Sequence, residues 1–594
     1  MLKVGITTGL YYIARAEELA TTLKKIGYGL TRGTDVIEIS GDAPHEVTYT
    51  EGEEIRHLAE KQGVDLLFHG SLTIPMGIPE RSDWRDAHDH IQKSIRSAVY
   101  SGCKYVLFHA CLHFWLEMIT YTTSKLEIVM CDHLGRFVSE VFYENGRLRE
   151  WFIRNMWDFE RSYPSFIVDE KDLREAEGGA RIESDIISQK LQEQKWEEYS
   201  KGYQPVMTQI GPRLNIPPAE KEKIENRIRE EVRKAAGDEY ARLFKKYMGE
   251  AARKKMGQKN YDKRKWKIDT YGKLTDGYNI MAHYLFYTKD PIWVEMCKVY
   301  SDILEKYKLN YSDDEWLDRA WKRAEETNDR RFKEFYYAAV AAKFLEGHMQ
   351  EALKWLNNEF IEKELAGKPE LQRIAKNLKI TIEMPDARDP KYAGLYLLWH
   401  PKQIYAAIKT IRKNLNTNSI HMTMDWEHIA GHGVDPLLVI GELKKMAPDF
   451  GSYILSVHSN APNPLHAHYP IELGDMDVYK LLYFLKETGM GRNHDVYILF
   501  ERGGGDDPFR QAVDALKLCV KFLEKGTHPD NLPPEFFGVR MTAGDYWRQE
   551  AIMKDHRFEP LKDLLETPEE EWGLLSSSAT KKGKTKEFKK EELK

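Results

Sequence analysis

Histidine and carboxylate side chains stand at the ends of short apolar runs that lie far apart in this sequence. The clearest run, Ile-His-Met-Thr-Met-Asp over 420–425, ends on Asp425, and His428 follows three residues later. Five other runs end in the same way, on His69, His109, Glu383, His458 and Glu501. Such groups gathered in one cavity would repel, or be costly to desolvate, unless cations lay between them. The pattern therefore predicts a metal site whose mixed donors suit Zn²⁺, Mn²⁺ or Fe²⁺ better than Mg²⁺ or Ca²⁺.

Strand-like and helix-like segments alternate along the chain, and this alternation would bring the predicted ligands together. Strands are expected at 4–7, 36–40, 65–69, 104–109, 379–384, 420–425, 452–458 and 496–501. Amphipathic helical patterns separate most of them, which is typical of parallel βα units. Four strands precede a long interruption and four follow it, and roughly 260 residues remain outside it, close to the size of a TIM barrel. A doubly wound open sheet is the alternative, but it does not need eight units.

We therefore predict an α/β fold, a (β/α)₈ TIM barrel. The interruption is predicted to be a large, mainly helical insertion after its fourth strand. We assign 1–113 and 370–530 to the barrel and 114–369 to the insertion. Within the insertion, alternating sidedness over 125–153 with a turn at Asn145 predicts a β-meander. Helical patterns follow, and the last helix either closes the insertion or forms part of the barrel wall. A C-terminal extension covers 531–575, and the Ser/Lys/Glu-rich tail over 576–594 is expected to be disordered.

The composition is that of a globular protein without an overall attraction to anionic partners. The chain of 594 residues carries a formal net charge of −6, so an anionic partner would need a local patch or metals to hold it. No apolar stretch approaches the about 20 residues of a membrane-spanning helix, and Met1 opens on a strand-like run rather than on a signal peptide. Five scattered cysteines without a Cys-x-x-Cys motif fit a reduced protein. We expect a cytoplasmic protein with no membrane partner, whose abundant Lys and Glu would suit a thermophile. The oligomeric state is left open.

A loop beyond the seventh strand adds a further histidine pair, His466 and His468. With this loop, the order of motifs resembles the xylose-isomerase-like TIM barrels, and among them the endonuclease IV type (AP endonuclease family 2). The resemblance covers about 1–110 and 375–525. The metal ligands that it implies are His69, His109, Glu383, Asp425, His428, His458, His466, His468 and Glu501. Glu383 falls on the bridging glutamate of that family. The family's Asp-Arg-His loop motif stands here as His466-Ala467-His468, with an imidazole in place of the carboxylate and no arginine.

The resemblance implies a metal-dependent hydrolase of phosphate esters, with nucleic acid, through abasic-site or related phosphodiester cleavage, as a candidate substrate. Two or three Zn²⁺ ions would activate a hydroxide for attack at phosphorus, and Glu383, Glu501 and His428 are implied as catalytic. The alternative is a single-metal sugar or sugar phosphate isomerase or epimerase using Mn²⁺ or Co²⁺, because the core of Glu383, Asp425, His458 and Glu501 is shared across the superfamily. In that case Glu383 and Glu501 would move a proton between neighbouring carbons. A second alternative is a scaffold that holds metal without turnover and uses the insertion for interactions.

Basic residues gather in one stretch of the insertion, where they could contact nucleic acid. They are Arg253, Lys254, Lys255, Lys263, Arg264 and Lys265, with Trp266 beside them. Such a composition can bind phosphates and stack on bases. A solvated helix face in a protein rich in Lys and Glu explains it equally well. His113, His421 and His432 lie off the strand-end pattern and are expected to be structural.

Overall fold

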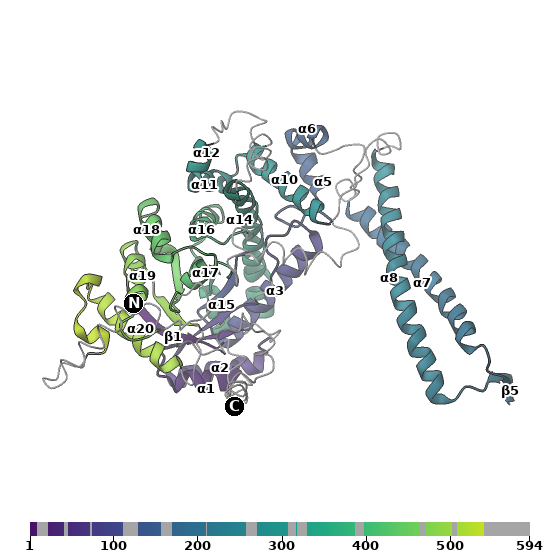
Figure 1. Ribbon diagram of the computed structural model, residues 1–594, viewed down its shortest axis with the longest axis horizontal. Coiled ribbons are helices and arrows are strands. Elements are labelled where there is room, and N and C mark those ends of the chain that lie inside the picture. The colour runs from purple at the N-terminus through teal and green to yellow at the C-terminus, as the bar shows by residue number, and fades with distance from the viewer. Residues whose placement is uncertain are drawn as a thin grey trace, which may run out of the picture. The chain divides into compact units, whose positions relative to one another are not determined.

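The eight expected strands form a closed parallel barrel in the computed structural model (Figure 1). The structure describes residues 1–8, 22–40, 46–71, 74–110, 129–155, 169–208, 211–256, 270–306, 317, 330–386, 397–462, 470–501 and 508–539. The barrel strands are β1 (Leu2–Thr7), β2 (Val36–Ser40), β3 (Asp65–His69), β4 (Tyr105–His109), β7 (Lys379–Glu383), β8 (Ile420–Asp425), β9 (Ile454–His458) and β10 (Val496–Phe500). Their order around the barrel follows the chain. The predicted (β/α)₈ fold is confirmed.

The strands are buried on both faces, as expected for a parallel sheet with side chains inside and helices outside. β2, β8, β9 and β10 are buried at every position. One cluster of the core joins Val36, Leu67, Tyr105, Leu107, Leu455, Tyr497 and Leu499 from β2, β3, β4, β9 and β10. The described helices that follow the strands are α1 (Thr22–Leu30), α2 (Tyr49–Gln62), α3 (Arg81–Ser101), α16 (Pro401–Asn414), α17 (Trp426–Gly431), α18 (Pro436–Met446), α19 (Met476–Glu487) and α20 (Pro508–Glu524).

The long insertion leaves the barrel register intact. β4 and β7 flank it in the chain, yet they pair directly, with Tyr105 opposite Lys379 and His109 opposite Glu383. The barrel closes through β1 and β10, where Leu2 pairs with Val496. Parallel neighbours end at the same side, so the last residues of these strands meet at one mouth.

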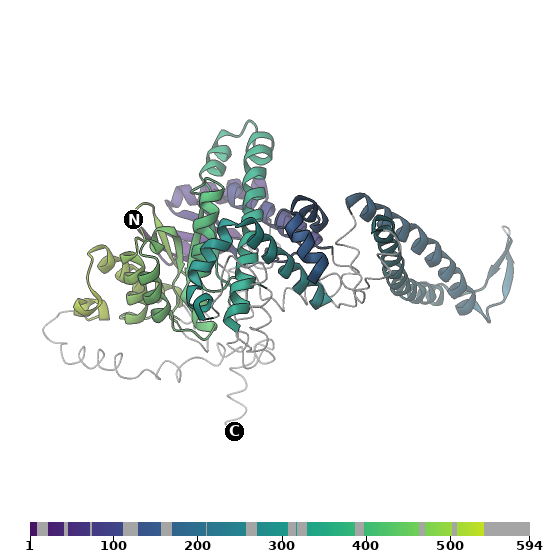
Figure 2. The same ribbon diagram turned by 90° about the horizontal axis from the view of Figure 1, so that it is seen from above.

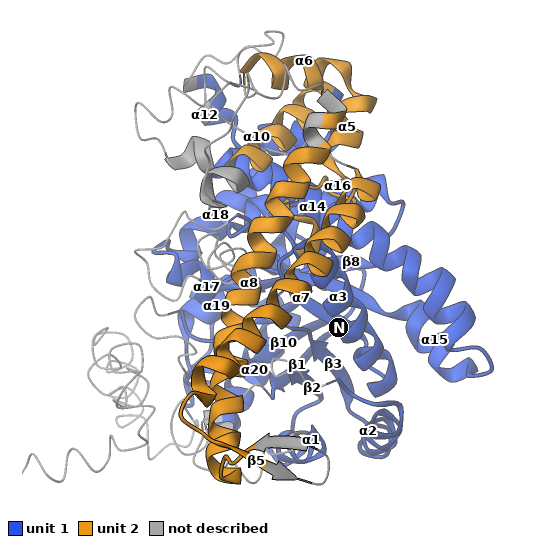
Figure 3. Ribbon diagram, turned by 90° about the vertical axis from the view of Figure 1, so that its right-hand side faces the viewer, with its two compact units in different colours: residues 1–78, 83–117, 288–594 blue, residues 79–82, 118–287 orange. Residues whose placement is uncertain are grey.

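The chain divides into two compact units, coloured separately in Figure 3. The barrel unit comprises 1–78, 83–117 and 288–594, and the second unit comprises 79–82 and 118–287. The helical segment therefore rejoins the barrel unit at 288, well before the boundary at 369 that we placed from the sequence. The elements of this returning part are α11 (Pro291–Val299), α12 (Ser301–Lys306), α14 (Arg330–Trp355), the π-helical segment η3 (Leu356–Glu364) and α15 (Pro369–Asn377). Of these, α11 and α14 pack against α16.

Two helices occupy much of the stretch where we predicted a β-meander. They are α5 (Val138–Glu144) and α6 (Gly146–Asn155), so the prediction is wrong from 138 to its end at 153. The buried residues of α6, Leu148, Trp151 and Phe152, recur at helical spacing. Asn145, which we read as part of a hairpin turn, instead accepts a hydrogen bond from the Leu148 N–H at 3.0 Å and so caps α6. The predicted first strand of the meander, over 125–130, lies mostly outside the described residues.

A long helical hairpin dominates the second unit. α7 (Glu170–Ser200) and α8 (Pro218–Met256) lie side by side in Figures 1 and 2, joined by the two-stranded sheet of β5 (Pro205–Thr208) and β6 (Gly211–Leu214). Small and aromatic residues interlock between the helices, including Ala180 of α7 and Phe244 of α8. Both helices are rich in charged residues rather than apolar. None of the described helices could cross a membrane.

Candidate metal centre

Strand register brings the predicted ligands together at the barrel mouth. His109 pairs with Glu383 across β4 and β7, and Asp425 pairs with His458 across β8 and β9. Seven of the nine predicted ligands form three overlapping groups whose ligand atoms lie within 4.8 Å of one another. The groups are His69, His109 and Glu383; Glu383, Asp425 and His458; and Asp425, His428 and Glu501. Glu383 and Asp425 each belong to two of these groups.

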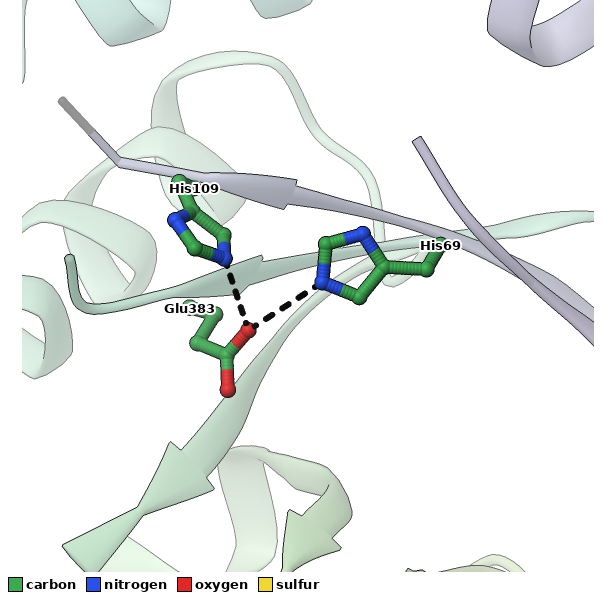
Figure 4. A group of neighbouring side chains, drawn as sticks. All are labelled: His69, His109 and Glu383. Carbon is green, nitrogen blue, oxygen red and sulfur yellow. Dashed lines mark ion pairs between the residues drawn. The ribbon is translucent and has the colours of Figure 1, made fainter. Parts of the chain in front are cut away.

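The first group uses one oxygen of Glu383, as Figure 4 shows. Oε2 of Glu383 lies 3.2 Å from Nε2 of His109 and 3.7 Å from Nε2 of His69. The other ring nitrogen of His69, Nδ1, lies 2.9 Å from the carbonyl oxygen of Gly70. A proton on Nδ1 satisfies that carbonyl and leaves the lone pair on Nε2, which faces the carboxylate. The backbone thus presents His69 in the tautomer that a metal ligand needs.

The second group uses the other oxygen of Glu383. Oε1 lies 2.8 Å from Nδ1 of His458, and the same nitrogen lies 3.9 Å from Oδ2 of Asp425. Glu501 is near as well, with Oε2 3.7 Å from this nitrogen. The side chains of Glu383, Asp425 and His458 are fully buried, whereas that of Glu501 is 20% exposed. Glu501, which belongs to the third group, is therefore more open to a substrate than the three residues of the second group.

The third group depends on the turn that follows β8. Oδ1 of Asp425 accepts hydrogen bonds from the N–H groups of Glu427 and His428, at 2.7 and 3.1 Å, and so caps α17. Its second oxygen, Oδ2, then points into the mouth and lies 3.6 Å from Nε2 of His428. Nδ1 of His428 lies 2.7 Å from the carbonyl oxygen of Met384, which again leaves Nε2 for a metal. The cap on α17 thus brings Asp425 Oδ2 and His428 Nε2 close together, which explains the Asp-x-x-His spacing.

Several buried polar atoms of these groups have no hydrogen-bond partner within the described residues. They are Oε1 and Oε2 of Glu383, Oδ2 of Asp425 and Nδ1 of His458. Buried polar atoms are rarely left in this state, because each costs about 1–3 kcal/mol and more when charged. Oxygen and nitrogen donors converging from several strands fit divalent cations such as Zn²⁺ or Mn²⁺. The donor set thus fits the predicted metals, and ligation itself stays a prediction.

Burial and mutual charge shift the titration of these groups in opposite directions. Burial raises the pKa of Asp425, and it raises that of Glu501 to about 7. Burial opposes charge on His428, yet Asp425 and Glu383 raise the pKa of His428 to about 10. Burial likewise opposes charge on His458, but Glu383 and Glu38 hold its pKa well above the ordinary value. Protonated imidazoles therefore balance the carboxylates, a role that metal cations would take over.

The remaining predicted site residues lie elsewhere or outside the described residues. His466 and His468 fall in the stretch 463–469, and Lys263, Arg264, Lys265 and Trp266 in the stretch 257–269, neither of which is described. Arg253, Lys254 and Lys255 lie near the end of α8, where only the Lys254 side chain is described, as exposed. Among the off-pattern histidines, His421 faces Arg412 across 2.7 Å, and His432 stacks on Trp399. Neither belongs to a ligand group, and His113 is not described.

Sequence reasoning missed a buried layer that supports the site. Glu38 of β2 lies 3.2 Å from His458 through Oε1 and Nε2, and it was not among the predicted residues. Asn460 also joins the site: its side-chain NH₂ group donates to Glu427 at 2.9 Å, and its side-chain oxygen Oδ1 accepts from the Glu501 N–H at 3.0 Å. A signal for Glu38 was present, because it is the one charged residue of the strand Val-Ile-Glu-Ile-Ser.

Comparison with known proteins gives structural similarity only. No family model matches the sequence, and no curated protein matches it. Solved structures that align with it include a D-tagatose 3-epimerase-like protein (10% identity, TM-score 0.35, 88% of this chain and 99% of that one). An L-ribulose 3-epimerase aligns at 10% identity and TM-score 0.34 over 91% of this chain and all of its own. A D-psicose 3-epimerase from Clostridium cellulolyticum H10 aligns at 8% identity and TM-score 0.32 over 88% and 99%. None of the three is an endonuclease by its name, and similarity this remote does not transfer an activity.

Proposed function

We propose that this chain is a metal-dependent enzyme that binds at least two divalent cations at the barrel mouth and hydrolyses phosphate esters. The observation that carries the proposal is the placement of Glu383. Its Oε2 faces His69 and His109, while its Oε1 faces His458. One carboxylate whose two oxygens face separate sets of nitrogen donors is arranged to bridge two ions. A single ion would leave the two histidines on one side without a function.

Paired cations a few ångströms apart suit phosphoryl chemistry. When bound, they activate water and neutralise the charge that develops on the phosphate oxygens. The residues of the chain would hold that arrangement: Glu383 spans the pair, Asp425 is locked by its cap on α17, and His428 is oriented by the Met384 carbonyl. Glu501, the more exposed carboxylate, would accept or donate a proton beside the substrate. Zn²⁺ is the proposed metal, because imidazole and carboxylate donors predominate.

Nucleic acid belongs to the proposal as a substrate class and is supported by sequence alone. The basic stretch over 253–267 carries it, and the structure describes only the start of that stretch. The basic stretch would act through its charge, so the affinity for DNA should fall steeply as the salt concentration rises if these residues contact phosphates. A sugar phosphate or another small phosphate ester would lack that dependence.

The second candidate is a sugar epimerase or isomerase with one ion. The observation that favours it is the pKa of Glu501, which burial raises to about 7. A carboxyl that titrates near neutrality can take up and return a proton efficiently, and Glu383 approaches the same nitrogen of His458 as Glu501 does. In this account Asp425 and His458 would hold the ion while the two glutamates face the substrate. Epimerisation is named for the compared structures, but at TM-scores below 0.5 this does not decide the matter.

Metal counting separates the two candidates. Elemental analysis of the zinc-loaded chain should find two or three ions, and Glu383→Gln should remove at least two because both groups lose the bridge. His69→Gln should remove one. His421→Gln is the matched control, a buried histidine near the other end of β8 that faces Arg412, and it should remove none.

Activity should then follow the count. We expect cleavage of an aryl phosphodiester or of abasic-site duplex DNA, with turnover lost in Glu383→Gln and kept in His421→Gln. One ion per chain together with C3 epimerisation of a ketohexose, followed by NMR, would establish the second candidate instead. A chain that binds metal but shows neither activity would support the remaining alternative, a scaffold that holds metal without turnover.

A further inference from the structure

A layer of hydroxyl groups lies inside the barrel directly beneath the predicted ligands. Thr381, Thr423 and Ser456 stand two residues before Glu383, Asp425 and His458 on the same three strands, so they share the inward face. Their hydroxyls form a chain, 2.8 Å between the threonines and 2.6 Å from Thr423 to Ser456. All three are fully buried. Interior layers of such barrels are usually filled with branched apolar residues, so this polar layer calls for a function.

Glu38 of β2 and Tyr105 of β4 add two more polar side chains beneath the predicted ligands. Glu38, on β2, has no exposed surface, and the fully buried Tyr105 donates its phenolic O–H to Oε2 of Glu38 at 2.5 Å. Oε1 of Glu38 lies 3.2 Å from Nε2 of His458. The two atoms face each other as an ion pair, and neither has a hydrogen-bond partner within the described residues. In that part of the chain, His458 is also the only basic side chain paired with Glu38.

The ring of His458 therefore stands between two carboxylates, Glu383 at Nδ1 and Glu38 at Nε2. A neutral imidazole carries one N–H and one lone pair. The nitrogen that can reach an ion shared with Asp425 is Nδ1, so the proton has to sit on Nε2, opposite Glu38. A carboxylate that accepts the outer N–H of a metal-binding histidine fixes its tautomer and orientation and strengthens it as a donor.

We propose that Glu38 is a positioning residue of the metal centre, which holds His458 with Nδ1 toward the ions, and that Tyr105 holds Glu38 in turn. The inference rests on the metal centre of the proposed function, and it holds whichever reaction the centre catalyses. It also explains why a carboxylate is kept in the barrel interior, where an unpaired charge would be strongly destabilising. In this arrangement one oxygen of Glu38 accepts from the His458 Nε2–H and the other accepts from the Tyr105 O–H.

The test is zinc affinity, measured by competition with a chromogenic chelator on the full chain. Glu38→Leu removes the acceptor and should weaken binding of the ion at His458 roughly 10- to 100-fold, the usual effect of losing such a partner. Glu38→Gln keeps a carbonyl oxygen toward Nε2 and should weaken it measurably but less. Should the leucine variant fail to fold, the glutamine variant carries the test by itself.

A matched control exists in the same unit. Glu334 is a nearly buried carboxylate that accepts a hydrogen bond from the buried Tyr300 hydroxyl at 2.5 Å, but its further neighbour is Gln403 rather than a ligand. Glu334→Leu removes an equivalent tyrosine–glutamate pair and should leave zinc affinity unchanged. An equal loss in this variant would mean that general destabilisation explains the Glu38 result, and would overturn the inference.

A second measurement reports on the tautomer directly. With ¹⁵N-labelled histidine and His458→Gln for assignment, the zinc-loaded chain should show a protonated Nε2 and a metal-shifted Nδ1 at this residue. Zinc bound through Nε2, or wild-type affinity in both Glu38 variants, would refute the role of Glu38 while leaving the metal centre standing. A wild-type chain that binds no zinc would refute the proposed function and this inference together.

Discussion

Loading the metal centre at pH 7 should release about 1.5 protons per chain or more. His428, with a pKa of about 10, is almost wholly protonated at pH 7, and His458, whose pKa Glu383 and Glu38 hold above the ordinary value, adds to the release. Glu501, with a pKa of about 7, is half protonated. Each group must lose its proton to donate a lone pair to a cation. For His428 alone, three pH units correspond to about 4 kcal/mol that the ion must supply.

The sign of the pH dependence follows from this competition. Protons and cations compete for the same atoms, so apparent zinc affinity should fall as pH falls, with a steep loss below about pH 7 where Glu501 also becomes protonated. Titration calorimetry in two buffers of different ionisation enthalpy gives the number of protons released. His428→Gln should lower that number by about one.

His421→Gln is the control for this experiment. Burial and the charge of Arg412 lower the pKa of His421 to about 2, so it carries no proton to release at pH 7. Proton release in this variant should match the wild type. A wild-type release below one proton, or an unchanged release in His428→Gln, would mean that the histidines of the mouth are neutral before metal binds. The charge balance derived from their geometry would then be wrong.

Three further predictions concern the fold. Burial lowers the pKa of His348, which stacks on Trp84, to about 3. The folded chain therefore keeps this histidine neutral at pH values where the unfolded chain binds a proton, so stability should be lost as pH falls from about 6.5 towards 3. The loss approaches roughly 5 kcal/mol at its limit, and urea unfolding of His348→Phe should show a smaller pH dependence. Asn145→Ala removes the cap on Leu148 and should cost about 1 kcal/mol in the stability of the second unit, again by urea unfolding. Replacing 170–256 with a short flexible linker removes the hairpin of α7 and α8 and should leave zinc content unchanged; a chain that loses its zinc would show that the hairpin supports the barrel.

Position in a strand explains which parts of the site the sequence could predict. His109 and Glu383 end their strands, and the ends of parallel strands converge, so recognising the barrel was enough to bring them together. Glu38 is the one charged residue of β2, but it sits in the middle of the strand, and strand position alone does not tell whether its side chain faces the interior or the helices. An ambiguity of period also led to the wrong meander, since Leu148 and Phe152 are four residues apart and fit one face of a strand as well as one face of a helix.

The number of cations could not be predicted from residue types, because it depends on which atom of each side chain faces which neighbour. Glu383 would occupy the same place in the sequence whether it binds one ion or bridges two. The distinction lies in its two oxygens, one toward His69 and His109 and the other toward His458. Orientation of this kind is set by groups outside the motif, such as the Met384 carbonyl that turns His428. A resemblance between motifs can therefore identify the donors, but the hydrogen bonds behind each donor decide how many ions the mouth can hold, and with that which chemistry is available to it.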